Sequence, residues 1–459
     1  DTVASSRNLA QYLASNSGVF SGAGTNVARI PISSGNFLDL KNAVVQFDFK
    51  NAANNTCSLD GSAACVIEQI SVIAGGQTIE TIRHYNQLDC ILEQYTSSDG
   101  NMRVQHVQKG GVRCLLTPLF VTAAGGGAAA VTNNGVSIGV VGGGVMSLSS
   151  IGGIGYDQTQ TSEIGTLKTQ KFTFGLRALG FFNPSTQKLL PPSTPFMLEI
   201  TFAPSANCLV SPSGGTVDYT VENFEVHIPE VRINDASFMS RIQSRMASPM
   251  AWKCNSYDHF VNTISNGTGN TVVQISARAR SLKGLMTVIR AQSHVTNKDK
   301  YKLSKRSIQY VSDYTYRLGS TSYPTQPVQF STDLAANGTP AGTRLPVAGT
   351  QLDIGEPYTQ AMRLFGNLNQ TGASCLISQE SFGQSELNNG VGILAMDFSA
   401  YADGSVNSGV NTLNNLPVSL EIKQTAANSG NLGNKQIDTY SVHELVIVRD
   451  GSGQLSSMY

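Results

Sequence analysis

Two segments of the first half of this chain recur, in the same order, in the second half. PFMLEIT at 195–201 returns as PVSLEIK at 417–423, and YTVENFEV at 219–226 returns as YSVHELVI at 440–447. Both segments are displaced by nearly the same distance, close to half the length of the chain. Repeats that stack into solenoids have periods of about 20 to 50 residues, so this much longer period predicts two whole domains of one kind. The chain has 459 residues, which is enough for two hydrophobic cores of ordinary size.

Between the repeats, short apolar runs alternate with turn residues, which is typical of strands. Apolar residues at every second position predict a strand at 44–49, and Gly75-Gly76 between two further runs predicts a hairpin turn. Further strands are expected at 27–32, 66–73, 78–82, 171–176, 196–202, 219–233, 272–277, 285–291, 393–398, 418–422 and 440–448. Many short strands with glycine- and proline-rich connections and few helices indicate β-sandwiches, so we expect an all-β fold.

Helical spacing is clearest at 85–95, where apolar or tyrosine side chains recur at i, i+3, i+6, i+7 and i+10. A short helix is also expected near the N-terminus, where Ser5 or Ser6 would cap a turn carrying Leu9, Tyr12 and Leu13. We therefore expect the segment 1–24 to form an arm that is either disordered or docked on a neighbour.

The chain is poor in charge. Charged residues make up 14%, against roughly 25% in a typical soluble domain, and 31 basic side chains balance 31 acidic ones. Because proteins near zero net charge tend to associate, we expect much of the surface to meet other protein. Neutrality also argues against broad electrostatic binding to nucleic acid.

Cysteine usage indicates where the chain is made. The seven cysteines are odd in number and include no C-x-x-C pair, which is typical neither of a disulfide framework nor of a zinc site. We therefore expect synthesis in a reducing, intracellular compartment. No basic segment followed by an apolar one opens the chain, so we expect no signal peptide.

Patterns that could carry catalysis are weak. Gly135 to Gly139 spell G-x-S-x-G around Ser137, but the glycine- and asparagine-rich flanks do not suit a strand–turn–helix nucleophile elbow. The segment 114–156 carries no charge, yet its glycine, asparagine and serine content argues against a membrane span. The histidines at 84, 106, 227, 259, 294 and 443 show no metal-binding spacing, and no phosphate-binding loop is present. We expect no catalytic residue, metal, cofactor or small-molecule substrate.

With the strands placed, the sequence resembles the double jelly-roll major capsid proteins of icosahedral double-stranded DNA viruses. One likeness is the strand–GGQ–helix pattern that runs from Ile70 through Gln77 into His84 and Tyr85. The segment 272–289 resembles the opening of the second jelly roll, and the segments at 397–399, 408–411 and 416–420 resemble its closing strands. In style the chain is closest to polinton-like, virophage and large-DNA-virus capsid proteins.

The resemblance implies two tandem eight-stranded antiparallel jelly-roll sandwiches with short helices in the loops. We expect an arm at 1–24, a first jelly roll at 25–235 and a second at 236–459, of which 236–256 form a connector. Trp252 in this connector is expected to be buried between the two lobes. The family's function is structural: a homotrimer forms a pseudo-hexagonal capsomer, and capsomers tile the icosahedral shell of a virion assembled inside the host cell. Its implied partners are copies of itself, penton proteins and minor capsid or cement proteins.

A run of basic residues is the one candidate contact site. It comprises Arg278, Arg280, Lys283, Arg290, Lys298, Lys300, Lys302, Lys305 and Arg306. Such a cluster would suit contact with the packaged genome, with the headgroups of an internal membrane or with an acidic partner. The alternative is a solvated strand edge, where lysine and arginine discourage stray strand pairing.

Two other functions stay open at this point. A secreted or surface β-sandwich that binds glycans or receptors would be favoured by glycans on the sequons at Asn54, Asn266, Asn337 and Asn369. A hydrolase would require activity that is lost on Ser137→Ala.

Overall fold

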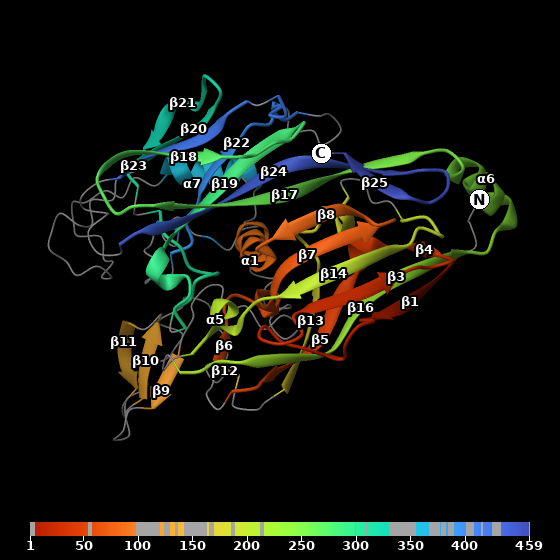
Figure 1. The fold of residues 1–459 in the computed structure, drawn as a ribbon, viewed down its shortest axis with the longest axis horizontal. Coiled ribbons are helices and arrows are strands. Elements are labelled where there is room, and N and C mark those ends of the chain that lie inside the picture. The colour runs from red at the N-terminus through yellow and green to blue at the C-terminus, as the bar shows by residue number, and fades with distance from the viewer. Residues whose placement is uncertain are drawn as a thin grey trace.

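The computed structural model shows two β-sandwiches packed against each other (Figure 1). The structure describes residues 5–53, 57–97, 120–123, 129–133, 136–141, 163–164, 169–184, 189–211, 215–298, 300–308, 311–329, 355–366, 377, 382–383, 390–400, 408–414, 416–424 and 433–458.

The first sandwich is built from strands before residue 234. One sheet has the order β1 (Ser5–Leu13), β16 (Tyr219–Ile233), β5 (Val44–Asn51) and β13 (Thr169–Gly175), and the short strands β2 (Val19–Phe20) and β4 (Phe37–Leu38) also pair with β16. The facing sheet has the order β3 (Val27–Ile32), β14 (Phe196–Phe202), β7 (Ile67–Ala74) and β8 (Gln77–Arg83). Stacked and edge-on aromatic rings fill the space inside, with Phe47 contacting Phe172, Phe174 and Phe224. These offset geometries are the ones that aromatic pairs prefer.

The second sandwich repeats this plan after residue 249. One sheet has the order β17 (Met250–Ile264), β24 (Lys435–Arg449), β19 (Leu282–Ala291) and β22 (Leu394–Asp397), with β25 (Leu455–Met458) also paired to β24. The other has the order β18 (Gly269–Ile275), β23 (Val418–Gln424), β20 (Asp313–Leu318) and β21 (Thr321–Gln329).

The internal sequence repeat maps onto equivalent strands. The first repeated segment lies on β14 and β23, each the second strand of a four-stranded sheet, and the second segment lies on β16 and β24, each the second strand of the opposite sheet. All pairs along the four sheet paths are antiparallel. With four strands on each path, the expected pair of eight-stranded antiparallel sandwiches is confirmed.

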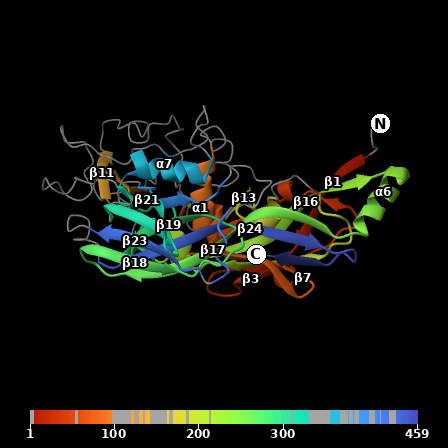
Figure 2. The ribbon, with the colours of Figure 1, turned by 90° about the horizontal axis from the view of Figure 1, so that it is seen from above.

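Short strands, helices and 3-10 turns lie outside the main sheets of the two sandwiches. The short strands are β6 (Cys57–Leu59), β12 (Glu163–Ile164), β15 (Leu209–Val210), β9 (Phe120–Ala123), β10 (Ala129–Asn133) and β11 (Val136–Val141). The helices are α1 (Tyr85–Thr96), α5 (Ser205–Cys208), α6 (Ala236–Met246) and α7 (Gly355–Leu364), with 3-10 turns η1 (Leu40–Asn42), η2 (Ala63–Val66), η3 (Gly180–Phe182) and η4 (Gln292–His294). Figure 2 shows β1 and α6 together at one end of the molecule and α7 with β11 toward the other.

The hairpin and the main helix form as predicted. Gly75 and Gly76 connect β7 to β8 with φ of 56° and 80°, a left-handed backbone that glycine adopts without steric cost. Helix α1 begins at Tyr85 and ends at Thr96.

One prediction about the chain is wrong. The expected N-terminal helix is instead strand β1, whose residues pair with β16 from Ser5↔Ile233 to Leu13↔Glu225, because the open edge of β16 supplies the backbone partners. Within the expected connector, helix α6 spans Ala236–Met246 and β17 begins at Met250 and runs on to Ile264. Strand β21 contains two prolines, which it tolerates because it lies at the edge of its sheet.

The uncharged segment at 114–156 lies largely outside the described residues. Its described parts are the strands β9, β10 and β11. Over the ranges that the structure describes, none of the helices has the length and apolar character needed to span a bilayer.

Candidate functional site: the interface between the two sandwiches

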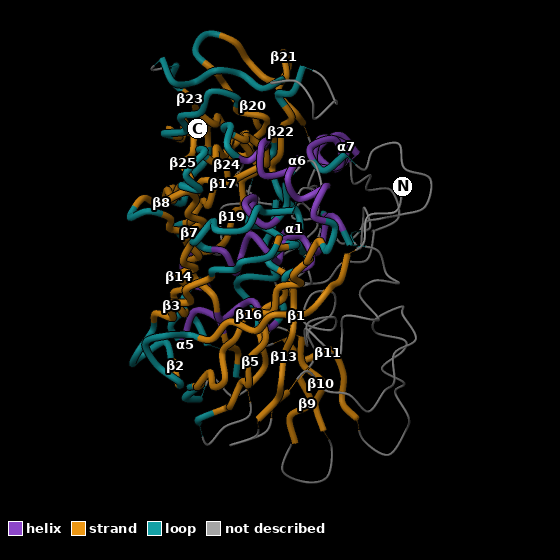
Figure 3. Tube along the Cα trace, turned by 90° about the vertical axis from the view of Figure 1, so that its right-hand side faces the viewer, coloured by secondary structure: helices purple, strands orange, loops and turns teal. Residues whose placement is uncertain are grey.

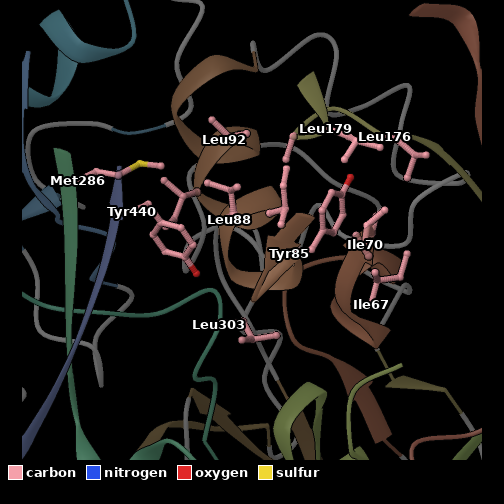
Figure 4. Packing of buried hydrophobic residues seen from close by; sticks show 14 of the residues in the cluster. Ile67, Ile70, Tyr85, Leu88, Leu92, Leu176, Leu179, Met286, Leu303 and Tyr440 are labelled. Atoms are coloured by element: carbon pink, nitrogen blue, oxygen red, sulfur yellow. The ribbon is translucent and has the colours of Figure 1, made fainter. Parts of the chain in front are cut away.

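Helix α1 lies between the two sandwiches, as Figure 3 shows. Its residues from Tyr85 to Tyr95 are all buried, which is typical of a helix covered on every side. In the close view of Figure 4, Leu88 lies beside Met286 and Tyr440 of the second sandwich, while Tyr85 lies near Ile70 of the first. The helix therefore belongs to the first half of the chain but packs into both cores.

The sheet β17–β24–β19–β22 is consequently covered on both faces. One face belongs to the second sandwich's own core, where the Tyr316 hydroxyl donates to Thr287 Oγ1 at 2.8 Å. The other face meets α1, where the Tyr440 hydroxyl lies within hydrogen-bonding distance of two acceptors, Gln87 Oε1 at 2.8 Å and the His84 carbonyl oxygen at 3.2 Å. This double coverage explains why nine consecutive residues of β24 are buried although several are polar.

A single buried carboxylate fixes a loop of the second half to the first. Asp60, only 1% exposed, accepts the backbone N–H groups of Lys302, Leu303 and Ser304 at 2.6, 2.8 and 3.0 Å. It also accepts the Ser304 hydroxyl at 2.8 Å. Four donors converge on one carboxylate, so its burial is compensated by charge-assisted hydrogen bonds.

The predicted basic contact site is corrected by the structure, because its nine members do not share one exposed surface. Arg290, Lys302, Lys305 and Arg306 are at most 4% exposed. Lys283, Lys298 and Lys300 are half-buried, and only Arg278 and Arg280 are exposed. Four of the nine cations are therefore not available to a genome, a membrane or a soluble partner.

The buried cations have partners within the protein. The Lys302 ammonium donates to the Leu209 carbonyl oxygen at 3.0 Å, and burial lowers its pKa. Arg306 donates to the Val391 carbonyl oxygen at 3.1 Å and also to Gln94 Oε1 on α1. Lys302 and Arg306 therefore bridge the two halves of the chain.

Arg290 belongs to a second buried charge cluster. Its guanidinium donates to Asp438 Oδ2 at 2.5 Å and to the Lys302 carbonyl oxygen at 2.7 Å. His259 Nε2 lies 3.0 Å from Asp438 Oδ1. The pKa of Asp438 lies well below its usual range; burial would raise it, but the charge of Arg290 and the hydrogen bond from His259 outweigh that effect.

Glu80 makes a further polar link across the interface. It is fully buried and accepts the N–H groups of Gly180 and Phe181 at 2.9 and 2.8 Å and the Ser256 hydroxyl at 2.6 Å. Burial raises its pKa to about 7, although these hydrogen bonds oppose the shift. Glu80 is thus shared between β8, η3 and β17.

The raised pKa of Glu80 predicts a pH dependence. Because the folded-state value lies above the ordinary 4.5, the protonated carboxyl stabilises the fold at low pH. This stabilisation is lost as the pH rises from about 4.5 through about 7. Glu80→Gln, neutral at every pH, removes the dependence, so its stability should improve relative to wild type between pH 5 and pH 8. Urea unfolding at pH 5 and at pH 8 measures the free energy of unfolding of the variant and of the wild type. If the difference between the two proteins is the same at both pH values, the prediction is contradicted.

The remaining sequence predictions have mixed outcomes. Trp252 is 7% exposed and lines a small gap with Leu40, Phe181 and Leu190 of the first sandwich, as expected. Ser137 lies within β11 rather than on a turn into a helix. Of the four sequons, Asn266 is exposed and the other three lie outside the described residues. No group of metal-ligating side chains forms in the part of the chain that the structure describes.

Sequence reasoning missed the polar interface. It treated the histidines as separate, yet the rings of His84 and His259 lie 4.3 Å apart. No sequence pattern marks Asp60, Glu80 and Asp438 as interface residues, because their partners are distant in sequence or are backbone groups. The one available hint was the scarcity of acidic residues within the basic run, where Asp299 stands alone.

Comparison with solved structures identifies the fold. No family model and no curated protein matches the sequence, whereas solved virus structures match nearly the whole chain. PBCV-1 VP54, fitted into a reconstruction of the virophage Sputnik, has a TM-score of 0.58 at 11% identity and covers 100% of this chain and 98% of its own. The Sputnik virophage structure has 0.53 at 9%, covering 99% and 88%, and the faustovirus major capsid protein has 0.50 at 8%, covering 97% and 91%. The chain shares with them the double jelly-roll fold.

Proposed function

We propose that this protein is the major capsid protein of an icosahedral double-stranded DNA virus and that its role is structural rather than enzymatic. The observation that carries the proposal is that two sandwiches of the same topology pack against each other within one chain. Buried polar contacts and a shared helix hold the halves together, and the likeness to virus capsid structures extends over the whole chain rather than one half.

This architecture suits a threefold assembly. Three copies of a two-lobed chain present six similar lobes, which can occupy sixfold positions in a closed shell. Each half also carries exposed aliphatic side chains on strands at sheet edges: Leu9 and Leu13 are 56% and 59% exposed, and Val261 and Val272 are both 52% exposed. Two dissimilar patches on one chain favour a head-to-tail contact, which closes into a ring when the rotation allows it.

We further propose domain boundaries and partners. The first jelly roll spans 25–235 and the second 236–459, with 1–24 as an arm that pairs with the first jelly roll through β1 and 236–256 as a connector that includes α6 and the start of β17. The partners are copies of the chain itself, first in a trimer and then in a lattice within the virion, together with penton and minor capsid proteins. The low charge of the chain supports extensive contact with other proteins.

Light scattering on the purified protein tests the trimer. A trimer has three times the chain mass of 48.7 kDa, and its negatively stained particles should have hexagonal outlines. Replacing Leu9 and Leu13 by glutamate should shift the mass toward 48.7 kDa while circular dichroism stays unchanged. A wild-type protein that stays monomeric at every concentration would contradict the proposal and favour a secreted or surface binding protein.

A further inference from the structure

Two histidines from different halves of the chain meet at the centre of the interface. His84 sits between β8 and α1, held at φ 49° and ψ 46°, and His259 lies on β17. Their ring centroids are 4.3 Å apart, and the His259 ring lies 4.8 Å from that of Tyr440. The Tyr440 hydroxyl lies 3.2 Å from the His84 carbonyl oxygen, so this contact also anchors the first turn of α1.

Next to the two histidines, one carboxylate contacts two basic side chains. Asp438 on β24 already pairs with Arg290 on β19 and contacts His259. With both imidazoles neutral, the charges of Arg290 and Asp438 balance. A proton on His84 adds a positive charge beside Arg290 that Asp438 alone does not compensate.

The other carboxyls on the surrounding elements are engaged elsewhere. On β8, Glu80 accepts hydrogen bonds from η3 and from β17, and on β17 the carboxylate of Asp258 faces His443. Asp60 is occupied by four donors of the loop at 302–304. On α1, the charge of Asp89 acts on the neighbouring Tyr85. Among the described residues, Asp438 is therefore the carboxylate in contact with this histidine pair.

We propose that His84, packed against His259, forms an acid-sensitive latch between the two sandwiches: protonation of the buried His84 ring beside His259 and Arg290 drives the two rings apart and loosens α1 from the β17–β24 sheet. The latch is a property of the single chain and does not depend on the proposed capsid function.

The direction of the effect follows from the burial of His84. Burial lowers its pKa to about 4, and the neighbouring His259 acts in the same sense, while the charge of Asp438 opposes the shift. A group whose folded-state pKa lies below its unfolded value of 6.5 keeps its full stabilising effect above that value. The effect is lost as the pH falls from 6.5 toward 4. The contribution of His84 to the interface should therefore be present at neutral pH and lost in mild acid, opposite in sign to the contribution of Glu80.

Native-state hydrogen exchange on the full chain tests the latch. After correction for intrinsic exchange rates, the protection of the α1 amides should fall between pH 7 and pH 4.5, while that of β5 and β16 in the first sandwich should hold. Replacing His84 by asparagine, which tolerates a left-handed backbone, should remove most of this fall, on the order of 50-fold for the pKa shift involved. The same substitution at His294, a half-buried histidine of η4, should leave the fall unchanged.

A second variant guards against a folding defect in the first. In His259→Gln the side-chain amide can still donate to Asp438, but the imidazole that helps to lower the pKa of His84 is gone, so the fall in α1 protection in acid should be smaller. The latch is wrong if α1 of the wild type keeps its protection relative to β5 at pH 4.5. It is equally wrong if both variants lose protection as steeply as the wild type does.

Discussion

Replacing Asp60 by alanine is expected to lower the free energy of unfolding by about 3 to 5 kcal/mol. The substitution leaves three buried N–H groups, those of Lys302, Leu303 and Ser304, without their shared acceptor. Urea unfolding followed by tryptophan fluorescence suits this measurement, because Trp252 lies at the interface of the sandwiches. The transition should move to lower urea concentration, and the loop around Ser304 should exchange its amide hydrogens faster.

Asp450 provides the matched control. Its carboxylate accepts three hydrogen bonds, one fewer than that of Asp60, from the N–H and hydroxyl groups of Ser452 and the N–H of Gln454, but these lie within one exposed turn. Because water can replace the lost partner there, Asp450→Ala should have a much smaller effect. If the two variants lose the same stability, Asp60 does not tie the halves together.

The second large effect is expected at the buried ion pair. Arg290→Met strands the Asp438 carboxylate in the interface and should cost about 3 to 5 kcal/mol. Adding Asp438→Leu removes the stranded charge, so the double variant should recover much of that loss. The pKa of Asp438 lies below its ordinary 3.8, so the stability from this carboxylate is present above that value and lost as the pH falls further.

An exposed pair calibrates this experiment. Arg29 and Glu199 lie 2.9 Å apart on neighbouring strands, but the arginine side chain is 56% exposed. The same double-variant cycle on that pair should show a coupling below about 1 kcal/mol. A coupling of that small size at Arg290 and Asp438 would mean that their charges do not stabilise the interface.

Local sequence patterns predicted the framework of the fold well. The strands at 196–202 and 219–233 begin and end at the predicted residues, because alternating apolar residues mark both strands and prolines at 195 and 204 flank the first. The duplication predicted two similar domains without reference to any contact. Strand β17 was missed because the buried position after Trp252 and Cys254 is the polar Ser256, and the half-buried residues that follow show no clear alternation.

The interface could not be predicted in the same way. Asp60 and Lys302 are 242 residues apart in sequence, and local spacing carries no information about such a contact. The basic run between Arg278 and Arg306 looked like a surface, since buried arginine and lysine are rare unless paired. Their partners are Asp438, Gln94 and backbone carbonyls, which only the folded chain brings near.

Electron cryo-microscopy of the purified assembly tests the central claim most directly. Two jelly rolls locked into one block should give a particle with threefold symmetry and six lobes, in which lobes of two kinds alternate and their relative orientation is the same in every copy. A twofold dimer, or a chain whose two lobes vary freely in orientation, would contradict the account.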